Sequence, residues 1–295
     1  MSPEAGPAPA AGWPRPVELA PGVSVGGPMD DPGRTPLPVI AGPCALESEE
    51  VALGIARWLS GLAGRLSVAA VFKSSFDKAN RSSVGSYRGP GLDAGLELLR
   101  RVRQETGLTL LTDVHEPGQC APVAEVCDVL QIPAFLCRQT DLVTAAAETG
   151  RAVNVKKGQF MAPEDMARVA EKAAAAGNDR VTVTERGHSF GYHNLVVDMR
   201  SFTLLHGLGI PVIYDATHSL QLPGSGAETG GDRRFAEPLA RAAVAAGADG
   251  VFLEVHPDPP RARSDAATQL PPERAEALLE SLVAVRRALA GAARV

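Results

Sequence analysis

The chain has 295 residues, of which 45% are hydrophobic and 21% charged, so it can build a large core and disorder is not expected. Its formal net charge of −5 argues against a general nucleic-acid binder, and every apolar run is shorter than the roughly 20 residues that cross a bilayer. The first 36 residues are rich in Pro, Ala and Gly and lack a basic start followed by an apolar stretch, so we expect no secretory signal. Four cysteines in so long a chain do not suggest a disulfide framework, and a reducing cytoplasm fits best.

The predicted elements begin with a disordered lead-in over residues 1–15 and a β-hairpin over residues 16–28, around Pro21-Gly22. Short apolar runs then alternate with helical segments; the runs are 37–42, 68–73, 108–114, 128–134, 152–157, 180–185, 211–217 and 250–255. Their nearly continuous apolar character is typical of parallel strands buried on both faces. A doubly wound sheet could alternate in the same way, but eight strands and eight helices favour a (β/α)8 TIM barrel. We therefore predict one α/β barrel domain over residues 16–295, hairpin included.

Polar side chains recur at the ends of these predicted strands, where TIM barrels keep their active sites. They are Cys44, Lys73, Asp113 and His115, Gln131, Lys156 and Lys157, Glu185 and Arg186, Asp215 and His218, and Glu254 and His256. One such residue would mean little, but the recurrence is hard to ascribe to core packing. The sequence therefore predicts a functional site at this end of the barrel.

Cationic residues form the first group within this expected site. They are Lys73, Lys78, Arg81, Arg138, Lys156 and Arg186. A single loop Lys or Arg is usually a solvated surface charge. Gathered at one barrel mouth, these side chains would suit phosphate and carboxylate groups, and the Ser and Asn residues of segment 72–91 would add hydrogen-bond donors.

The second group, Cys44, His218, Glu254 and Asp265, offers a thiolate, an imidazole and two carboxylates. Such a mixed set suits a divalent ion such as Mn, Fe(II), Co or Zn, and barrel closure would bring the first, seventh and eighth strands together. The alternatives are a packed thiol at Cys44, a hydrogen-bonded histidine at His218 and a turn or cap residue at Asp265. The other thiols, Cys120, Cys127 and Cys137, and the imidazole of His206 are most simply structural.

Several motifs are more specific than these groupings. The stretches "AGPCALES", "FKSSFDKANRSS", "SYRGPG", "TDVHEP", "NVKKGQF", "DATHSLQLPG" and "VFLEVHPDPPRARSDAATQLP" resemble the 3-deoxy-D-manno-octulosonate 8-phosphate synthase family, over roughly residues 37–271. Lys78-Ala79-Asn80-Arg81-Ser82 discriminates best, because the related 3-deoxy-arabino-heptulosonate 7-phosphate synthases carry a Lys-Pro-Arg-Thr type of stretch there. The resemblance implies a transferase of lipopolysaccharide (Kdo) biosynthesis. It would condense phosphoenolpyruvate with D-arabinose 5-phosphate and water, giving the eight-carbon sugar acid phosphate and inorganic phosphate.

The resemblance also implies roles for individual residues. Phosphoenolpyruvate would be held by Lys73, Ser75, Lys78, Lys156 and Arg186, and arabinose 5-phosphate by Asn80, Arg81, Ser82 and Asp113, with Gln131 and Gln159 in support and Arg138 reaching across a subunit boundary. Of these, Lys73, Lys78, Asn80 and Asp113, together with His218, are the expected catalytic residues.

The family is usually a homotetramer, its hairpin closes the far end of the barrel, and its metal-dependent class carries cysteine where the metal-independent class carries asparagine. Cys44, with His218, Glu254 and Asp265, therefore implies the metal-dependent class. His188 and His193 are expected to be non-catalytic.

Three other functions share parts of this pattern. A heptulosonate synthase would take erythrose 4-phosphate instead, and a Schiff-base aldolase would use Lys156 or Lys157 as its nucleophile. A phosphosugar-binding protein on an old barrel would bind ligand without releasing phosphate.

Overall fold

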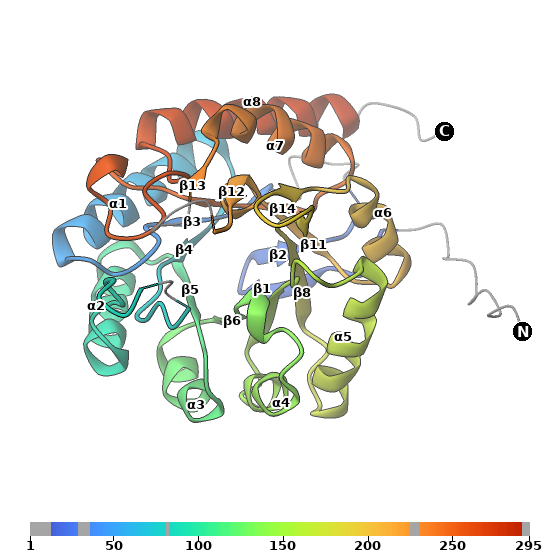
Figure 1. Cartoon of the computed structure of the whole chain (residues 1–295), viewed down its shortest axis with the longest axis horizontal. Helices are drawn as coiled ribbons and strands as arrows, with labels where there is room; N and C mark the ends of the chain where they lie inside the picture. Colours follow the sequence, from blue (N-terminus) through green and yellow to red (C-terminus); the bar gives the residue numbers. More distant parts are fainter. Residues whose placement is uncertain (1–12, 29–35, 81–82, 225–229, 291–295) are drawn as a thin grey trace, which may run out of the picture.

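The computed structural model describes residues 13–28, 36–80, 83–224 and 230–290. Eight parallel strands close into a barrel in the order β11-β14-β3-β4-β5-β6-β7-β8, and helices surround it (Figure 1). The barrel strands are β3 (Pro38–Gly42), β4 (Ala69–Lys73), β5 (Thr109–Asp113), β6 (Val129–Ile132), β7 (Ala152–Lys156), β8 (Val181–Glu185), β11 (Val212–Asp215) and β14 (Gly250–Glu254). The predicted TIM barrel is confirmed.

The surrounding helices are α1 (Glu49–Leu66), α2 (Leu92–Thr106), α3 (Pro117–Val126), α4 (Thr140–Glu148), α5 (Met166–Ala175), α6 (Arg200–Gly207), α7 (Ala236–Ala245) and α8 (Pro272–Ala290). The first shows how the sequence sets such a helix. The Ser48 side chain accepts a hydrogen bond from the Val51 amide at 3.2 Å and so caps α1. Buried residues at helical spacing, among them Ile55, Leu59 and Leu62, then face the strands. Within the described segments, the helices are all too short or too polar to cross a membrane.

The barrel interior has an apolar layer below a polar one. Side chains of Val71, Leu111, Ile213 and Phe252, with others, form the lower layer. Because side chains alternate along a strand, the residue two positions further on points inward again, one layer higher. Those positions are Lys73, Asp113, Asp215 and Glu254, together with Gln131 and Asn154. Because every second side chain of a strand points inward, the same strand contributes one residue to the apolar core and the next inward residue to the polar site.

The hairpin of β1 (Val17–Ala20) and β2 (Val23–Val25) packs against the lower layer. Val17, Leu19 and Val25 are buried against inward-facing residues of the barrel strands, so the hairpin closes the end of the barrel opposite the polar layer. Residues 13–15, which we expected to belong to the lead-in, also lie on the barrel: the Trp13 ring packs 5.2 Å from the His206 ring. The other residues of that segment, 1–12, lie outside the described residues.

Replacing Leu19 with alanine is expected to destabilise the protein by about 2–4 kcal/mol, because it leaves a cavity in the hairpin plug. Leu19 is 2% exposed, whereas Leu208 is 40% exposed and supplies the matched control, Leu208→Ala. Urea unfolding measures the difference. Equal midpoints for the two variants would show that the hairpin does not contribute to the core.

Candidate active site and metal centre

A cavity of about 790 Å³ opens at the C-terminal ends of the strands. Of the expected site residues, those that line it are Lys73, Lys78, Asn80, Asp113, Gln131, Lys156, Gln159, Arg186, His218 and Asp265. Ser75, Cys44 and Glu254 are fully buried beside it. Arg138 is exposed and is not among the lining residues, and Arg81 and Ser82 lie outside the described residues.

The turn that carries Cys44 depends on a close approach of two strands. A Cβ atom at Gly42 would lie 2.0 Å from the carbonyl oxygen of Lys73, so only glycine lets β3 end against β4. The Cys44 amide then donates to the Gln269 side chain at 3.3 Å, and the Leu46 amide donates to the Ser75 carbonyl at 3.0 Å. These bonds hold the thiol in place beside the cavity.

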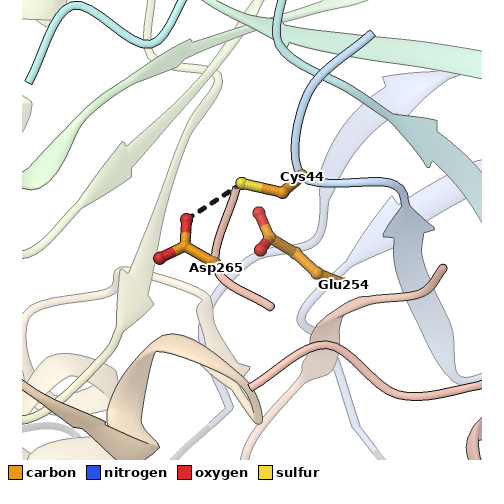
Figure 2. A group of neighbouring side chains, drawn as sticks. All are labelled: Cys44, Glu254 and Asp265. Carbon is orange, nitrogen blue, oxygen red and sulfur yellow. Dashed lines mark hydrogen bonds between the residues drawn. The ribbon is translucent and has the colours of Figure 1, made fainter. Parts of the chain in front are cut away.

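Three of the four expected metal ligands lie together. One ligand atom from each of Cys44, Glu254 and Asp265 lies within 4.8 Å of the other two (Figure 2). The Cys44 Sγ atom lies 3.0 Å from Asp265 Oδ2 and 2.8 Å from the Ser264 hydroxyl. Glu254 Oε2 is buried and has no hydrogen-bond partner among the described residues, so a buried lone pair is left for a cation. This donor set fits a divalent transition ion.

The buried Cys44 thiol is a poor nucleophile as it stands. Burial, and then the nearby Asp265 and Glu254 carboxylates, raise the pKa of Cys44 well above its usual value. A bound cation would reverse this balance, because coordination deprotonates a thiol. The thiol also forms no disulfide, since all four cysteines of the chain are free. Of the uses considered for Cys44, a metal ligand and a packed thiol remain.

The fourth expected ligand, His218, stands beside this group. Its Nε2 atom lies 3.4 Å from Glu254 Oε1, while its Nδ1 atom lies 2.9 Å from Asp215 Oδ2. A carboxylate on one ring nitrogen is the usual way to orient a metal-binding imidazole and leave the other nitrogen as the donor. Asp215 therefore orients His218 toward Glu254. The position of Asp215 at the end of a strand was visible in the sequence, but its contact with His218 was not.

Four cations of the expected collar are buried: Lys73, Lys78, Lys156 and Arg186. Lys73 is 1% exposed, and its Nζ atom lies 3.4 Å from Glu254 and 3.6 Å from Asp113. Lys156 donates to Asp215 at 2.6 Å and lies 3.7 Å above the Phe252 ring. Burial would raise the pKa of Asp113, but the charges of Lys73 and Lys78 outweigh it and lower that pKa. Lys73 and Lys78 thus favour the ionised form of Asp113.

Arg186 differs from these lysines because it has no carboxylate within ion-pair distance in the part of the chain that the structure describes. Its Nη2 atom donates to Gln221 at 2.6 Å, and its buried Nη1 atom has no hydrogen-bond partner among the described residues. Burial lowers the pKa of Arg186, yet a guanidinium remains protonated in proteins. A buried, partly unpaired guanidinium in a cavity wall is a site for an anion.

A chain of hydrogen bonds fixes Asp113 in place. Gln131 donates to Asp113 at 2.6 Å and accepts from Asn154 at 2.8 Å. Asn154 in turn accepts from Thr182 and Thr184, and the Ser75 hydroxyl donates to the other Asp113 oxygen. Asn154, Thr182 and Thr184 were not among the expected site residues. Their inward positions on β7 and β8 are the signal that could have identified them.

The other thiols and three of the histidines lie away from the cavity lining. Cys120, Cys127 and Cys137 are buried outside the cavity lining, and burial raises the pKa of Cys127 to about 12. His206 bonds Asp249 at 2.8 Å. His188 lies 3.2 Å from Lys157, and His193 lies 2.9 Å from the Pro223 carbonyl. None of these residues lines the cavity.

Together, the closed barrel, the cationic cavity and the adjacent thiol and carboxylates define a TIM-barrel protein whose cavity suits anions and whose donor group suits a divalent cation. The sequence pattern described as the DAHP synthetase I family matches residues 31–290, and the chain belongs to this family.

Curated relatives agree with the motifs. The chain is 56% identical over 254 residues to a protein of Syntrophotalea carbinolica, covering 86% of this chain and 92% of the relative. It is 59% identical over 248 residues to one of Nitratidesulfovibrio vulgaris, strain DP4, covering 84% and 91%. It is 53% identical over 266 residues to one of Desulfatibacillum aliphaticivorans, covering 90% and 97%. All three bear the name 2-dehydro-3-deoxyphosphooctonate aldolase, which confirms the resemblance drawn from the motifs.

Proposed function

We propose that this chain condenses phosphoenolpyruvate with D-arabinose 5-phosphate and water to give 3-deoxy-D-manno-octulosonate 8-phosphate and inorganic phosphate, a step of Kdo and lipopolysaccharide synthesis. C3 of phosphoenolpyruvate attacks the sugar aldehyde, water adds at C2, and phosphate leaves by cleavage of the C2–O bond. The observation that carries the proposal is the buried cationic wall, and above all the partly unpaired Arg186 guanidinium. Two anionic substrates repel each other, and fixed cations in a cavity offset that repulsion.

Phosphoenolpyruvate is assigned to the side of the cavity formed by β7 and β8. Lys156 and Arg186 lie there, Lys73 and Lys78 face them across the cavity, and Gln159 lines the same wall. Ser75, which follows β4 and donates to Asp113, is assigned to phosphoenolpyruvate together with Lys73 and Lys78. The unpaired Nη1 atom of Arg186 supplies a donor for a phosphate or carboxylate oxygen.

The sugar phosphate is assigned to the loop after β4, where Asn80 lines the cavity and Arg81 and Ser82 follow in the sequence. Asp113 and Gln131, held by their hydrogen bonds, face the same space and would orient the sugar hydroxyls. The exposed position of Arg138 is compatible with a contact to a neighbouring subunit, and we propose a cytoplasmic homotetramer.

A divalent ion (Mn, Fe(II), Co or Zn) is assigned to Cys44, His218, Glu254 and Asp265. The orphaned Glu254 oxygen and the crowding of thiol and carboxylate support it. When bound, such an ion supplies a Lewis acid that can polarise the aldehyde, orient the sugar or position the attacking water. Asp215 orients His218. Burial would raise the pKa of Glu254, but His218, Lys73 and Lys78 together lower it.

Phosphate release from phosphoenolpyruvate tests both the substrate and the metal. We expect release with arabinose 5-phosphate and much less with erythrose 4-phosphate. Exhaustive chelation should lower the rate by at least about 100-fold, and added Co²⁺ or Mn²⁺ should restore it. A preference for erythrose 4-phosphate would instead identify a heptulosonate synthase. A chelated protein that keeps its full rate and binds no metal would refute the metal assignment.

A further inference from the structure

Asp265 occupies a backbone conformation that must be held from outside. Its φ of 48° lies in the left-handed region, and only Ser67 shares such a φ among the non-glycine residues that the structure describes. This region costs an L-residue roughly 1 kcal/mol, although Asp tolerates it better than most. On the C-terminal side, the Thr268 and Gln269 amides donate to the Asp265 carbonyl at 3.0 and 3.2 Å. On the N-terminal side, the stabilising contacts come from another loop at the barrel mouth.

Glu47 provides the contact on the N-terminal side of Asp265. Its Oε1 atom accepts a hydrogen bond from the backbone amide of Arg263 at 2.8 Å, two residues before Asp265. Its Oε2 atom lies 3.5 Å from His256 Nε2. The His256 Nδ1 atom accepts from the Asp258 amide at 3.0 Å, and its buried Nε2 atom lies near Glu47 without forming a hydrogen bond among the described residues. The Glu47 carboxylate therefore ties the loop after β3 to the segment just before Asp265 and lies beside the start of the loop after β14.

Tyr87 adds a third loop to this arrangement. Its hydroxyl donates to the Leu46 carbonyl at 2.7 Å, next to Glu47, and the Arg263 guanidinium lies 4.8 Å from the centre of its ring. The contact joins the loop that carries Asn80 to the loop that carries Asp265. Tyr87 and Arg263 both line the cavity mouth, so they lie beside the site rather than in the distant core.

The geometry points to a positioning device, which we name the loop clasp: Glu47, Tyr87, His256 and Arg263. It ties together the loops after β3, β4 and β14 and so sets the position of the Asp265 carboxylate opposite Cys44. This inference rests on the proposed function, because it takes the Cys44, Glu254 and Asp265 group to be a metal site. It also assigns a role to residues of the "ALES", "SYRGPG" and "VHPDPPRARSD" motifs that the proposed function leaves without one.

Metal affinity tests the clasp directly. Metal-free protein is titrated with Co²⁺, and binding is followed by the thiolate-to-cobalt absorption band and by dialysis. Glu47→Ala should weaken Co²⁺ binding by about 10-fold, the lower end of the range for residues that support metal ligands. Glu47→Gln keeps an acceptor for the Arg263 amide and should recover most of that loss. Glu49→Ala removes a carboxylate on the surface of α1 that pairs with Arg101 of α2. This control variant should bind Co²⁺ as the parent does.

Tyr87 variants separate the two contacts of that ring. Tyr87→Phe keeps the surface for Arg263 and should change Co²⁺ affinity less than Tyr87→Leu, which loses both contacts. In Co²⁺-loaded Glu47→Ala, kcat should fall while KM for phosphoenolpyruvate stays within about two-fold, because Lys156 ends β7 and Arg186 directly follows β8, away from these loops. Arg263→Ala distinguishes positioning from direct substrate binding. A raised KM for arabinose 5-phosphate with unchanged Co²⁺ affinity would make Arg263 a substrate ligand and overturn its place in the clasp.

The outcomes also separate the clasp from the proposed function. A parent that binds Co²⁺ but releases no phosphate contradicts the proposed reaction and leaves the clasp measurable. A parent that is active, with Glu47→Ala binding Co²⁺ as tightly as Glu49→Ala, overturns the clasp alone. A parent that binds no Co²⁺ overturns the clasp together with the metal assignment.

Discussion

Replacing Cys44 with serine is expected to weaken Co²⁺ binding by at least about 100-fold and to lower phosphate release to a similar extent when the metal is limiting. Serine has nearly the volume of cysteine and can keep the contacts to Ser264 and Asp265, which lie 2.8 and 3.0 Å from the sulfur. Its hydroxyl is a much poorer ligand than a thiolate for a transition ion. The loss therefore reports coordination rather than packing.

The matched control is Cys120→Ser. Cys120 is also a buried free thiol, but it lies on α3 and its sulfur contacts only the Glu116 carbonyl, at 3.9 Å, among the hydrogen bonds of the described residues. This variant should keep the parent's Co²⁺ affinity and rate, with only a modest loss of stability. If Cys44→Ser and Cys120→Ser behave alike in the Co²⁺ titration, Cys44 is a packed thiol and not a ligand.

Lys156→Met is expected to cost both stability and activity. Lys156 is 6% exposed and pairs at 2.6 Å with the buried Asp215. Removing one partner of a buried pair leaves the other charge uncompensated, at a cost of about 3–5 kcal/mol. The same change removes a cation from the proposed phosphoenolpyruvate wall and loosens Asp215, which orients His218. We expect phosphate release to fall by about 1000-fold, because fixed charges in a site contribute several kcal/mol each.

Lys157→Met separates these two effects. Lys157 is fully buried beside Lys156 and lies 3.5 Å from Glu185, but it does not line the cavity. It should lose comparable stability while the folded protein keeps KM and kcat within about ten-fold of the parent. Adding Asp215→Asn to Lys156→Met should recover part of the stability and none of the activity. Normal KM for phosphoenolpyruvate in Lys156→Met would contradict its proposed role.

Much of the fold could be predicted because each strand is short, apolar and bounded by turn or helix signals. The run at 250–255 corresponds to β14 (Gly250–Glu254), and the run at 108–114 to β5 (Thr109–Asp113). The polar residues at the C-terminal ends of the strands were predictable for a similar reason. In β14 the inward-facing Phe252 lies in the core, and two residues later Glu254 lies in the site. Local periodicity contains this information, because side-chain direction in a strand depends on the backbone alone.

The supporting residues could not be predicted in this way. Glu47 precedes α1 in a loop, and nothing near it in the sequence indicates that it accepts a hydrogen bond from the Arg263 amide, 216 positions away. Gln269 is similarly distant from the Cys44 amide to which it bonds. Such partners are chosen by the three-dimensional approach of loops that share no local pattern.

The TIM barrel, the common mouth of its polar strand ends and the family match of its motifs could all be inferred from the residues in order along the chain. The pairing of those polar groups appears only in three dimensions: Lys73 with Glu254 and Asp113, Lys156 with Asp215, and Arg186 with no carboxylate within ion-pair distance among the described residues. The tertiary structure also placed Cys44, Glu254 and Asp265 within 4.8 Å of one another. The physical reason is barrel closure, which makes β14 and β3 neighbours although they lie at opposite ends of the chain.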